Sequence, residues 1–413
     1  MQADHLKTTG SNLTKPTGFV VANDADPKRA FMLTHQINRL NTGNCIITNH
    51  LAQNFPNLYY RNYKKGEDTR VKFDRICCDV PCSSDAAIRK IPQKWATWNT
   101  KDSQALHPLQ LTILRKAVEM LKVGGKMTYS TCSLNPIENE SVVAAALKEF
   151  EGKIRLVKAE LPGFRHQPGM TSWQFLNSES KGKPEGQDSF FKQYQHHQEI
   201  PEPMQQYIKE TMFCSNYSPE ILAELPKCVR VMPHHQNTSG FFITVIEKIA
   251  ELDSDLPQIA QTDASESVED MVIQNDPKKR DFNFFRCDSN DPDVQYIKAY
   301  YGLSSMPSAQ MVTQDPATMN RVYYVNSELS RFLQADTKAH ELNIISLGTT
   351  IFQRNKSTGQ SAGVECIFRT NQDGVGMLIS EMKNRIVKTD SAIDFKRLIM
   401  RKYHEIKTDF KCQ

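Results

Sequence analysis

Residues 103–131 read SQALHPLQLTILRKAVEMLKVGGKMTYST, a helix pattern followed by a strand pattern. The apolar residues of 103–121 recur at helical spacing, which predicts an amphipathic helix. Gly124-Gly125 then turns the chain, and 126–131 is predicted to be a strand. Residues 71–79, VKFDRICCD, predict another strand before the helix. A strand, a helix and a second strand in this order are typical of a parallel βαβ unit.

The same alternation extends in both directions along the chain. Residues 18–23, GFVVAN, predict a strand, and Asp26 with Pro27 predicts the capped start of a helix that runs to about Leu40. A strand at 45–48 and a helix at 138–150 follow the same pattern. Two apolar stretches, 228–232 and 240–246, are joined by a short polar connection and predict an antiparallel pair. The sequence therefore predicts an α/β fold with a doubly wound parallel sheet.

Composition changes mark the expected domains. Residues 1–17 are polar, and 18–247 carry the α/β pattern. The segment 248–280 is an acidic linker, because 251–276 contain eight acidic residues and no lysine or arginine. Residues 281–413 contain strand patterns at 321–325, 349–352 and 364–368, together with aromatic residues, and predict a small α+β domain. Residues 150–225, within the α/β part, predict irregular structure.

The overall composition excludes several classes of protein. The 413 residues carry a net charge of +4, and no apolar run approaches a membrane span. The polar start lacks a secretory signal, and none of the ten cysteines forms a CxxC pair, so neither secretion nor a metal site is expected. Only 18 glycines occur, against roughly 29 at average usage. No GxGxxG or GxxxxGK[ST] loop is present.

Two loops at predicted strand ends carry the residues that suggest chemistry. Asp79 and Cys82 lie in DVPCSSD after the 71–79 strand, and Cys132 lies in TCSLNPIENE after the 126–131 strand. Ligands bind at the carboxyl ends of strands in such sheets. If the two strands are adjacent, both thiols and the carboxylate face one crevice.

A thiolate can add to C6 of a pyrimidine and make C5 nucleophilic enough to accept a methyl group. A second group then eases loss of the C5 proton, and a carboxylate stabilises charge on the ring. One nucleophilic cysteine, one cysteine for release and one aspartate thus fit methylation of cytosine at C5. Two alternatives remain open at this point: cysteines that serve only as packing residues, and a regulatory disulfide between Cys82 and Cys132.

These motifs resemble those of the Nop/Sun family of RNA (cytosine-5) methyltransferases, most of all its eukaryotic multisite tRNA branch. The stretches that carry the resemblance are DVPCSSD, YSTCSLNPIENE, GFVVANDADPKR, ELPG at 160–163 and RVMPHHQNTSGFF at 230–242. It covers about 18–247 and continues more weakly over 281–400, which resembles the domain before the family's PUA-like domain. The resemblance implies a class I methyltransferase fold, S-adenosylmethionine as methyl donor, tRNA or other RNA as partner, and the nucleus as location, with nucleolus or cytoplasm as alternatives.

The resemblance also implies a role for each matching residue. Cys132 would attack C6, and Cys82 would assist release of the methylated product. Asp79 would contact the cytosine and lie near the donor. Asp24, at the end of the GFVVAND strand, would bind the donor's ribose.

Three departures from the family pattern bear on activity. The first donor-binding strand and its CAAPGxK-type loop are absent from residues 1–17, so we expect an internal portion of a longer protein or a truncated paralogue. We also expect an unpaired gap between the strands at 45–48 and 71–79. Leu51 replaces an aspartate that contacts adenine, and Ser84 replaces a glycine in a turn that needs positive φ. The alternative to an enzyme is therefore a catalytically inactive RNA-binding protein on the same fold.

Overall fold

The computed structural model describes most of the chain, and its residues form two compact units. The described residues are 17–62, 67–179, 190–252, 284–333, 342–355 and 366–386. The split unit comprises 1–51, 58–70 and 271–413, and the central unit comprises 52–57 and 71–270. Of the predicted segments, the polar stretch 1–16 and the acidic stretch 253–280 lie outside the described residues. The predicted domain boundaries stay a prediction.

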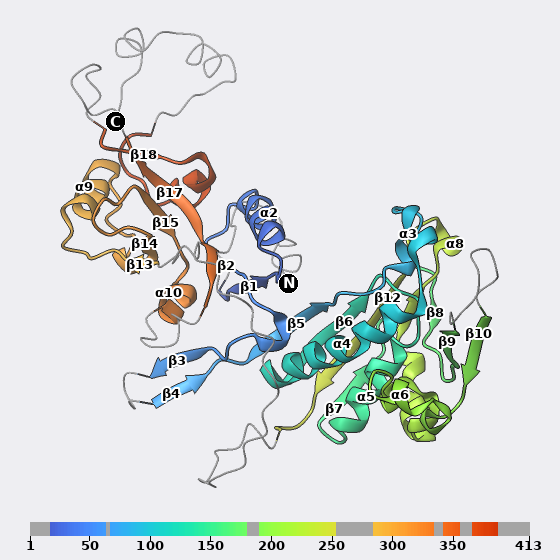
Figure 1. Ribbon diagram of the computed structural model, residues 1–413. Coiled ribbons are helices and arrows are strands. Elements are labelled where there is room, and N and C mark those ends of the chain that lie inside the picture. Colours follow the sequence, from blue (N-terminus) through green and yellow to red (C-terminus); the bar gives the residue numbers. More distant parts are fainter. Residues whose placement is uncertain are drawn as a thin grey trace. The chain divides into compact units, whose positions relative to one another are not determined.

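The central unit is built on a six-stranded mixed sheet (Figure 1). Its strands are, in sheet order, β5 (Phe73–Asp79), β6 (Leu121–Thr131), β12 (Phe241–Lys248), β11 (Val229–Val231) and β8 (Gln167–Pro168), with β7 (Ile154–Val157) also paired to β12. β5 and β6 are parallel, whereas β12 is antiparallel to both β6 and β11. The predicted parallel pair and the predicted antiparallel pair are both confirmed.

The predicted glycine turn is a bulge inside β6. Phe73 lies opposite Leu121, but Arg75 already lies opposite Lys126, so residues 122–125 are looped out of the pairing. Gly124 has a φ of 77°. This conformation is unfavourable for any residue that carries a Cβ atom. The glycine thus permits β6 to begin five residues earlier than its regular pairing.

Helix α4 (Thr100–Met120) leads from β5 to β6 and packs against both strands (Figure 1). Asn99 caps it, because its side chain accepts a hydrogen bond from the Asp102 amide. Leu111, Leu114 and Val118 recur at helical spacing and are buried. Burial contributes about 1.5–3 kcal/mol for each such side chain, so packing on the sheet stabilises this helix.

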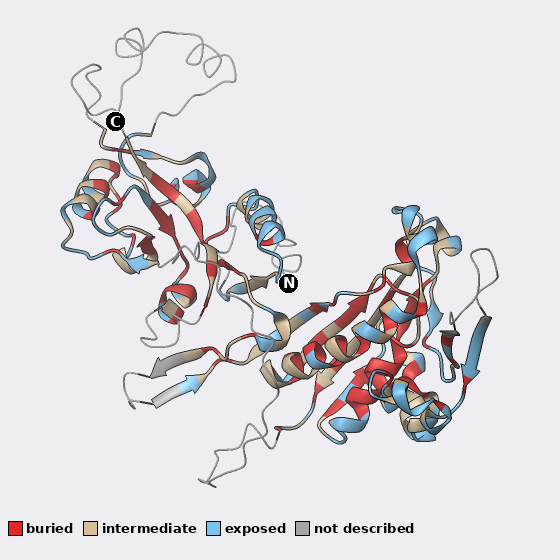
Figure 2. Cartoon of the chain, viewed as in Figure 1, coloured by how far each residue is buried: buried red, intermediate tan, exposed pale blue. Residues whose placement is uncertain are grey.

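The stretch 150–225, predicted to be irregular, covers helix α5 (Glu140–Glu149). It contains the hairpin β9 (Phe175–Glu179) and β10 (Phe190–Tyr194) and the short helices α6 (Glu202–Gln205) and α7 (Pro219–Glu224). Tyr217 donates its hydroxyl hydrogen bond to the Ser141 carbonyl at 3.1 Å. Residues 140–147 of α5 are all buried (Figure 2). Helix α5, which is polar at its start and apolar along the rest of its length, is therefore enclosed between the sheet and the stretch 150–225.

The split unit contains the first predicted strands and helix. β1 (Val20–Asn23) and β2 (Cys45–Thr48) are parallel, and α2 (Pro27–Asn38) connects them. The Asp26 side chain accepts hydrogen bonds from the amides of Lys28 and Arg29, which confirms the predicted cap. The predicted gap between the 45–48 and 71–79 strands left an edge of the 45–48 strand unpaired, and that part of the prediction is wrong. β16 (Ile344–Leu347) pairs with β2 on that edge, although it lies about three hundred residues further along the chain.

The split unit also contains a five-stranded antiparallel sheet. Its strands are β13 (Phe285–Arg286), β14 (Met311–Thr313), β15 (Arg321–Tyr324), β17 (Thr349–Arg354) and β18 (Phe368–Thr370). The same unit contains helices α9 (Pro292–Tyr301), α10 (Ser327–Leu333) and α11 (Val375–Leu378). Strands β3 (Tyr59–Asn62) and β4 (Glu67–Arg70) form a separate two-stranded antiparallel sheet, and β3 contacts α10. The predicted α+β class of this part is confirmed, with the last strand a few residues later than 364–368.

Candidate active site

The two predicted cysteine loops meet at one edge of the central sheet. Asp79 ends β5 and lies opposite Ser130, one residue before Thr131 ends β6. Because β5 and β6 are adjacent and parallel, the loops that follow them leave the sheet at the same edge. Cys82 Sγ lies 3.2 Å from Cys132 Sγ, and both are free thiols of intermediate exposure. The structure therefore brings together three of the four predicted site residues.

The two thiols of this pair differ in their pKa values. The hydrogen bond from Cys82, aided by the Ser84 hydroxyl and opposed by burial, lowers the pKa of Cys132 to about 6. The same hydrogen bond and burial raise the pKa of Cys82. Cys132 is thus the thiolate of the pair near neutral pH, and Cys82 is the thiol that donates to it. The Asp79 carboxylate, exposed beside them, accepts a hydrogen bond from Ser130 Oγ at 3.3 Å.

Ser84 has a part in the site that the sequence argument missed. Its φ of 61° is in the left-handed region, as expected for a position where the family carries glycine. Its Oγ lies 3.3 Å from both Cys132 Sγ and the Cys82 carbonyl oxygen, and its one proton can be donated to either of them. The strained backbone therefore carries a hydroxyl to the predicted nucleophile. Only its place two residues after Cys82 could have signalled this.

Glu138 joins the two cysteine loops. Its side chain is fully buried, and it accepts hydrogen bonds from the Ser83 amide at 2.8 Å and from Ser83 Oγ at 2.5 Å. It also accepts from Ser133 Oγ at 2.9 Å and from Gln110 Nε2 at 3.0 Å. Ser83 follows Cys82 and Ser133 follows Cys132, so a single carboxylate fixes the residue next to each thiol. The sequence offered no pattern that distinguishes Glu138 from its neighbours.

A buried ion pair holds the rest of the second loop. Arg230 Nη1 lies 2.6 Å and 2.7 Å from the two Glu140 carboxylate oxygens, and Arg230 Nη2 donates to the Leu134 carbonyl. The Leu134 amide in turn donates to the Asp85 carboxylate at 2.7 Å. The amide and the carbonyl of Leu134 are therefore both held by charged side chains.

Gly240 allows the 230–242 segment to approach this loop. A Cβ at that position would lie 2.7 Å from Ala86 Cβ, closer than such atoms approach each other. The Gly240 amide donates to the Ala86 carbonyl at 3.1 Å, and the Ala86 amide donates to the Cys132 carbonyl at 3.2 Å. Ala86, directly after the first cysteine loop, is thereby hydrogen-bonded both to the second cysteine loop and to the 230–242 segment.

The fourth predicted residue, Asp24, lies in the split unit. It follows β1, and its Oδ1 accepts a hydrogen bond from the Asp26 amide at 2.9 Å. Its Oδ2 lies 3.1 Å from Arg29 Nε. The carboxylate keeps acceptor capacity beyond these two partners. Leu51, in the same unit, has no atom that could accept a hydrogen bond from adenine.

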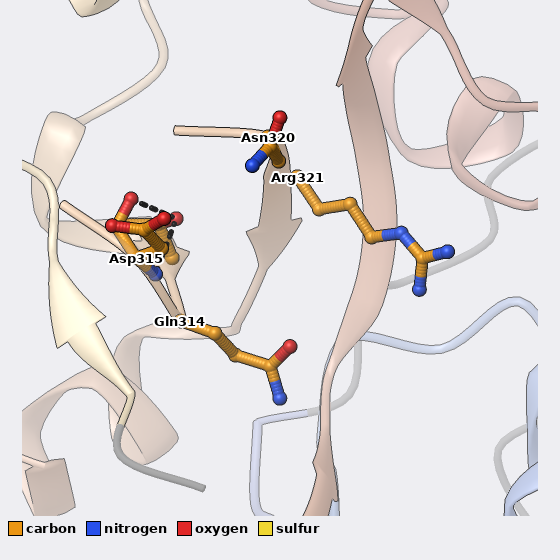
Figure 3. Close-up of a pocket in the computed structure, with 5 residues that line it drawn as sticks. Gln314, Asp315, Asn320 and Arg321 are labelled. Carbon is orange, nitrogen blue, oxygen red and sulfur yellow. Dashed lines mark hydrogen bonds between the residues drawn. The ribbon is translucent and has the colours of Figure 1, made fainter. Parts of the chain in front are cut away.

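A polar cavity of about 240 Å³ lies elsewhere in the split unit (Figure 3). Thr313, Gln314, Asp315, Asn320 and Arg321 line it. The Asp315 carboxylate already accepts hydrogen bonds from the amides of Ala317 and Thr318, at 3.1 and 3.3 Å. It therefore caps a turn, and none of the predicted site residues lines this cavity.

Neither a metal centre nor a membrane-spanning helix is found among the described residues. Within them, no group of three or more His, Cys, Asp or Glu side chains could hold a metal ion. None of the helices in the described part of the chain is both long and apolar enough to cross a membrane.

Known proteins match the chain in two blocks. The family described as 16S rRNA methyltransferase RsmB/F matches residues 6–247. The NSUN2 Pre-PUA domain matches residues 282–383. The first block contains both cysteine loops and Asp24, and the second contains the five-stranded sheet.

Individual relatives match both blocks together. The multisite-specific tRNA:(cytosine-C(5))-methyltransferase of Saccharomyces cerevisiae is 34% identical over 94% of this chain and 56% of its own length. The tRNA (cytosine(34)-C(5))-methyltransferase of Drosophila melanogaster is 36% identical over 82% of this chain and 48% of its own. The chain thus spans about half the length of these curated relatives. A methyltransferase homologue from Pyrococcus horikoshii, of known crystal structure, is 24% identical over 56% of this chain and 53% of its own, with a TM-score of 0.35.

Proposed function

This chain belongs to the 16S rRNA methyltransferase RsmB/F family, and on that premise we propose that it methylates C5 of cytosine in tRNA. The expected class I methyltransferase fold is that of the family. The observation that carries the proposal is the thiol pair, 3.2 Å apart at the ends of two parallel strands, with one pKa lowered to about 6. Cysteines that served only in packing would need neither a 3.2 Å separation nor a thiol with a lowered pKa.

The proposed donor is S-adenosylmethionine, as in the family. In the central unit, Asp79 ends a parallel strand and keeps acceptor capacity for a ribose hydroxyl or an amino group. In the split unit, Asp24 follows a parallel strand and keeps similar capacity, and its role toward the donor's ribose is proposed from the family resemblance alone. When bound, S-adenosylmethionine supplies an electrophilic methyl group. Leu51 contributes no polar contact, so the adenine would be held by shape and by other residues.

The cysteines divide the work on the base. The Cys132 thiolate forms a bond to C6 of a flipped cytosine, and the C5–C6 double bond supplies the electron pair for C5. After C5 gains its methyl group, it must lose its proton so that the C5–C6 double bond re-forms and the Cys132–C6 bond breaks. The C5 proton passes to solvent, and Cys82, the thiol that donates a hydrogen bond to Cys132 Sγ, is placed to stabilise the departing Cys132 thiolate. Glu138 and Arg230 keep the two loops in register throughout.

The test is to trap the covalent intermediate. In Cys82→Ala, release is impaired, so mixing the protein with S-adenosylmethionine and a tRNA transcript should accumulate an RNA adduct that survives denaturing electrophoresis. Cys132→Ala and the double variant should form none. Cys214→Ala is the matched control, because Cys214 is a free thiol of similar exposure away from both loops. A Cys214→Ala protein that behaves like the parent, with no adduct in Cys82→Ala, would contradict the proposal.

The alternative is an RNA-binding protein without catalysis. Leu51 favours it, since that side chain cannot contact adenine through a hydrogen bond. RNA binding without an adduct in Cys82→Ala and without 5-methylcytosine in product RNA would support this alternative. Nuclear residence is proposed from the family resemblance alone, and imaging of the tagged protein in cells would test it.

A further inference from the structure

The segment that leaves the first cysteine loop has an unusual composition. Residues 86–101 read AAIRKIPQKWATWNTK, with four basic residues, two tryptophans and no acidic residue. We call 86–101 the tryptophan segment. It includes α3 (Gln93–Thr97) and begins within three residues of Ser83. Basic and aromatic side chains in alternation are typical of surfaces that bind nucleic-acid strands.

The backbone of the tryptophan segment is ordered by its own hydrogen bonds. The Ile91 amide donates to the Ala87 carbonyl at 3.0 Å, the Trp95 amide to Pro92 at 3.0 Å, and the Trp98 amide to Lys94 at 2.8 Å. Arg89 ties the segment to the 230–242 motif, because its Nη1 donates to the Thr238 carbonyl at 2.9 Å. Figure 1 draws α3 and α8 (Pro233–Gln236) at the same end of the central unit. The backbone of the segment is therefore held next to the cysteine loops.

Trp95 is nevertheless left in solvent. It is 79% exposed, whereas Trp98 is 37% exposed and lies 6.5 Å from the Phe191 ring. Ile91, in the same segment, is 46% exposed. A tryptophan indole gains free energy when it is covered, and an ordered backbone that presents it to water indicates a partner surface.

The charges select the kind of partner. Lys90 and Lys101 are exposed on the tryptophan segment, and Lys94 directly precedes Trp95. A polyanion with flat apolar groups fits this combination, since lysines bind phosphates and an indole stacks on a base. Flipping a target cytosine also leaves its neighbours partly unstacked, so an aromatic face close to the site would replace the lost stacking.

We propose that the tryptophan segment binds the RNA strand next to the target cytosine, with a base stacked on Trp95 and phosphates at Lys90, Lys94 and Lys101. The inference rests on the proposed function, because it places the strand relative to the cysteine loops. Trp98 is less exposed than Trp95 and packs near the Phe191 ring, so it is not itself the stacking face.

The test measures RNA affinity rather than methylation. Trp95→Ala in the full chain should raise the Kd for a tRNA transcript and for a single-stranded RNA about tenfold, the range seen when a stacking aromatic is removed. Trp95→Phe should recover most of the loss, since it keeps a flat ring. Lys90→Gln with Lys94→Gln should reduce the slope of log Kd against log salt concentration, as loss of phosphate contacts requires.

The matched control is Tyr207→Ala. Tyr207 is 70% exposed in the same unit but outside the tryptophan segment, so its loss should leave the Kd unchanged. The proposal is overturned if Trp95→Ala binds like the parent, if Tyr207→Ala loses as much, or if the parent binds no RNA; the first result would leave a protein segment as the occupant. If Trp95→Ala weakens RNA binding but Cys82→Ala forms no adduct, the catalytic proposal is contradicted while the RNA-binding role of the tryptophan segment is supported.

Discussion

Glu138→Ala should strongly destabilise the central unit and disorder both cysteine loops. The carboxylate accepts from four donors, two at each oxygen: the Ser83 amide and Gln110 Nε2 at one, and Ser83 Oγ and Ser133 Oγ at the other. All four belong to buried residues. Alanine would remove every acceptor at once and leave a space among polar groups.

The magnitude follows from which donors can find another acceptor. The two hydroxyls can rotate, and they lie 3.4 Å from each other, so part of their loss is recovered. The Ser83 amide and the Gln110 N–H cannot turn away, and each buried unsatisfied donor costs about 1–3 kcal/mol. We therefore expect a loss of about 3–5 kcal/mol in the free energy of unfolding, a large part of the roughly 5–15 kcal/mol of a typical domain.

Glu138→Gln separates hydrogen bonding from mere filling of space. Its amide oxygen can serve the Ser83 amide and Gln110, while its NH₂ donates to the two hydroxyls, which then act as acceptors. The network survives, so the loss should be only about 1–2 kcal/mol from weaker, uncharged bonds.

The assay is urea unfolding followed by circular dichroism, together with the rate of Cys132 alkylation in the folded state. Glu149→Ala is the control, because Glu149 pairs with Arg115 on the surface and such pairs contribute about 0–1 kcal/mol. A Glu138→Ala protein as stable as Glu149→Ala, or a Glu138→Gln protein as unstable as Glu138→Ala, would refute this account of the network.

Three further predictions concern the same loops. Alkylation of Cys132 by iodoacetamide, followed by mass spectrometry, should be fast above its pKa of about 6 and slow as the pH falls through that value; a midpoint near the ordinary thiol value of about 8.5 would contradict the shared hydrogen bond. Ser84→Gly should relieve the strain of the left-handed backbone and raise the free energy of unfolding by about 1 kcal/mol. It should also raise the alkylation midpoint by about one pH unit, because the hydroxyl near Cys132 is lost. Ser84→Ala should raise the midpoint without stabilising the protein, and equal midpoints in all three proteins would exclude a role for the hydroxyl. Arg230→Met should cost about 3–5 kcal/mol in urea unfolding because it strands the buried Glu140 carboxylate, and adding Glu140→Met should restore much of it; a double variant as unstable as the single one would argue against the ion pair.

Local features of the chain were predictable from the sequence. The cap at Asp26, the strand at 45–48 and the helix before the Gly124-Gly125 bulge each follow from residues within about four positions of one another. The meeting of Cys82 and Cys132 was predictable too, because parallel strands joined by one helix present their carboxyl ends together.

Long-range partners were not predictable in this way. β16 covers an edge of β2 that the sequence left free, and Glu138 reaches Ser83 across 55 positions. Ser84, which the family pattern marked as a misfit, instead places its hydroxyl 3.3 Å from the predicted nucleophile. Periodicity and capping report only on neighbours along the chain. Which buried acceptor meets which donor depends on how distant segments pack, so the tertiary structure alone decided how the two cysteine loops are held and tuned.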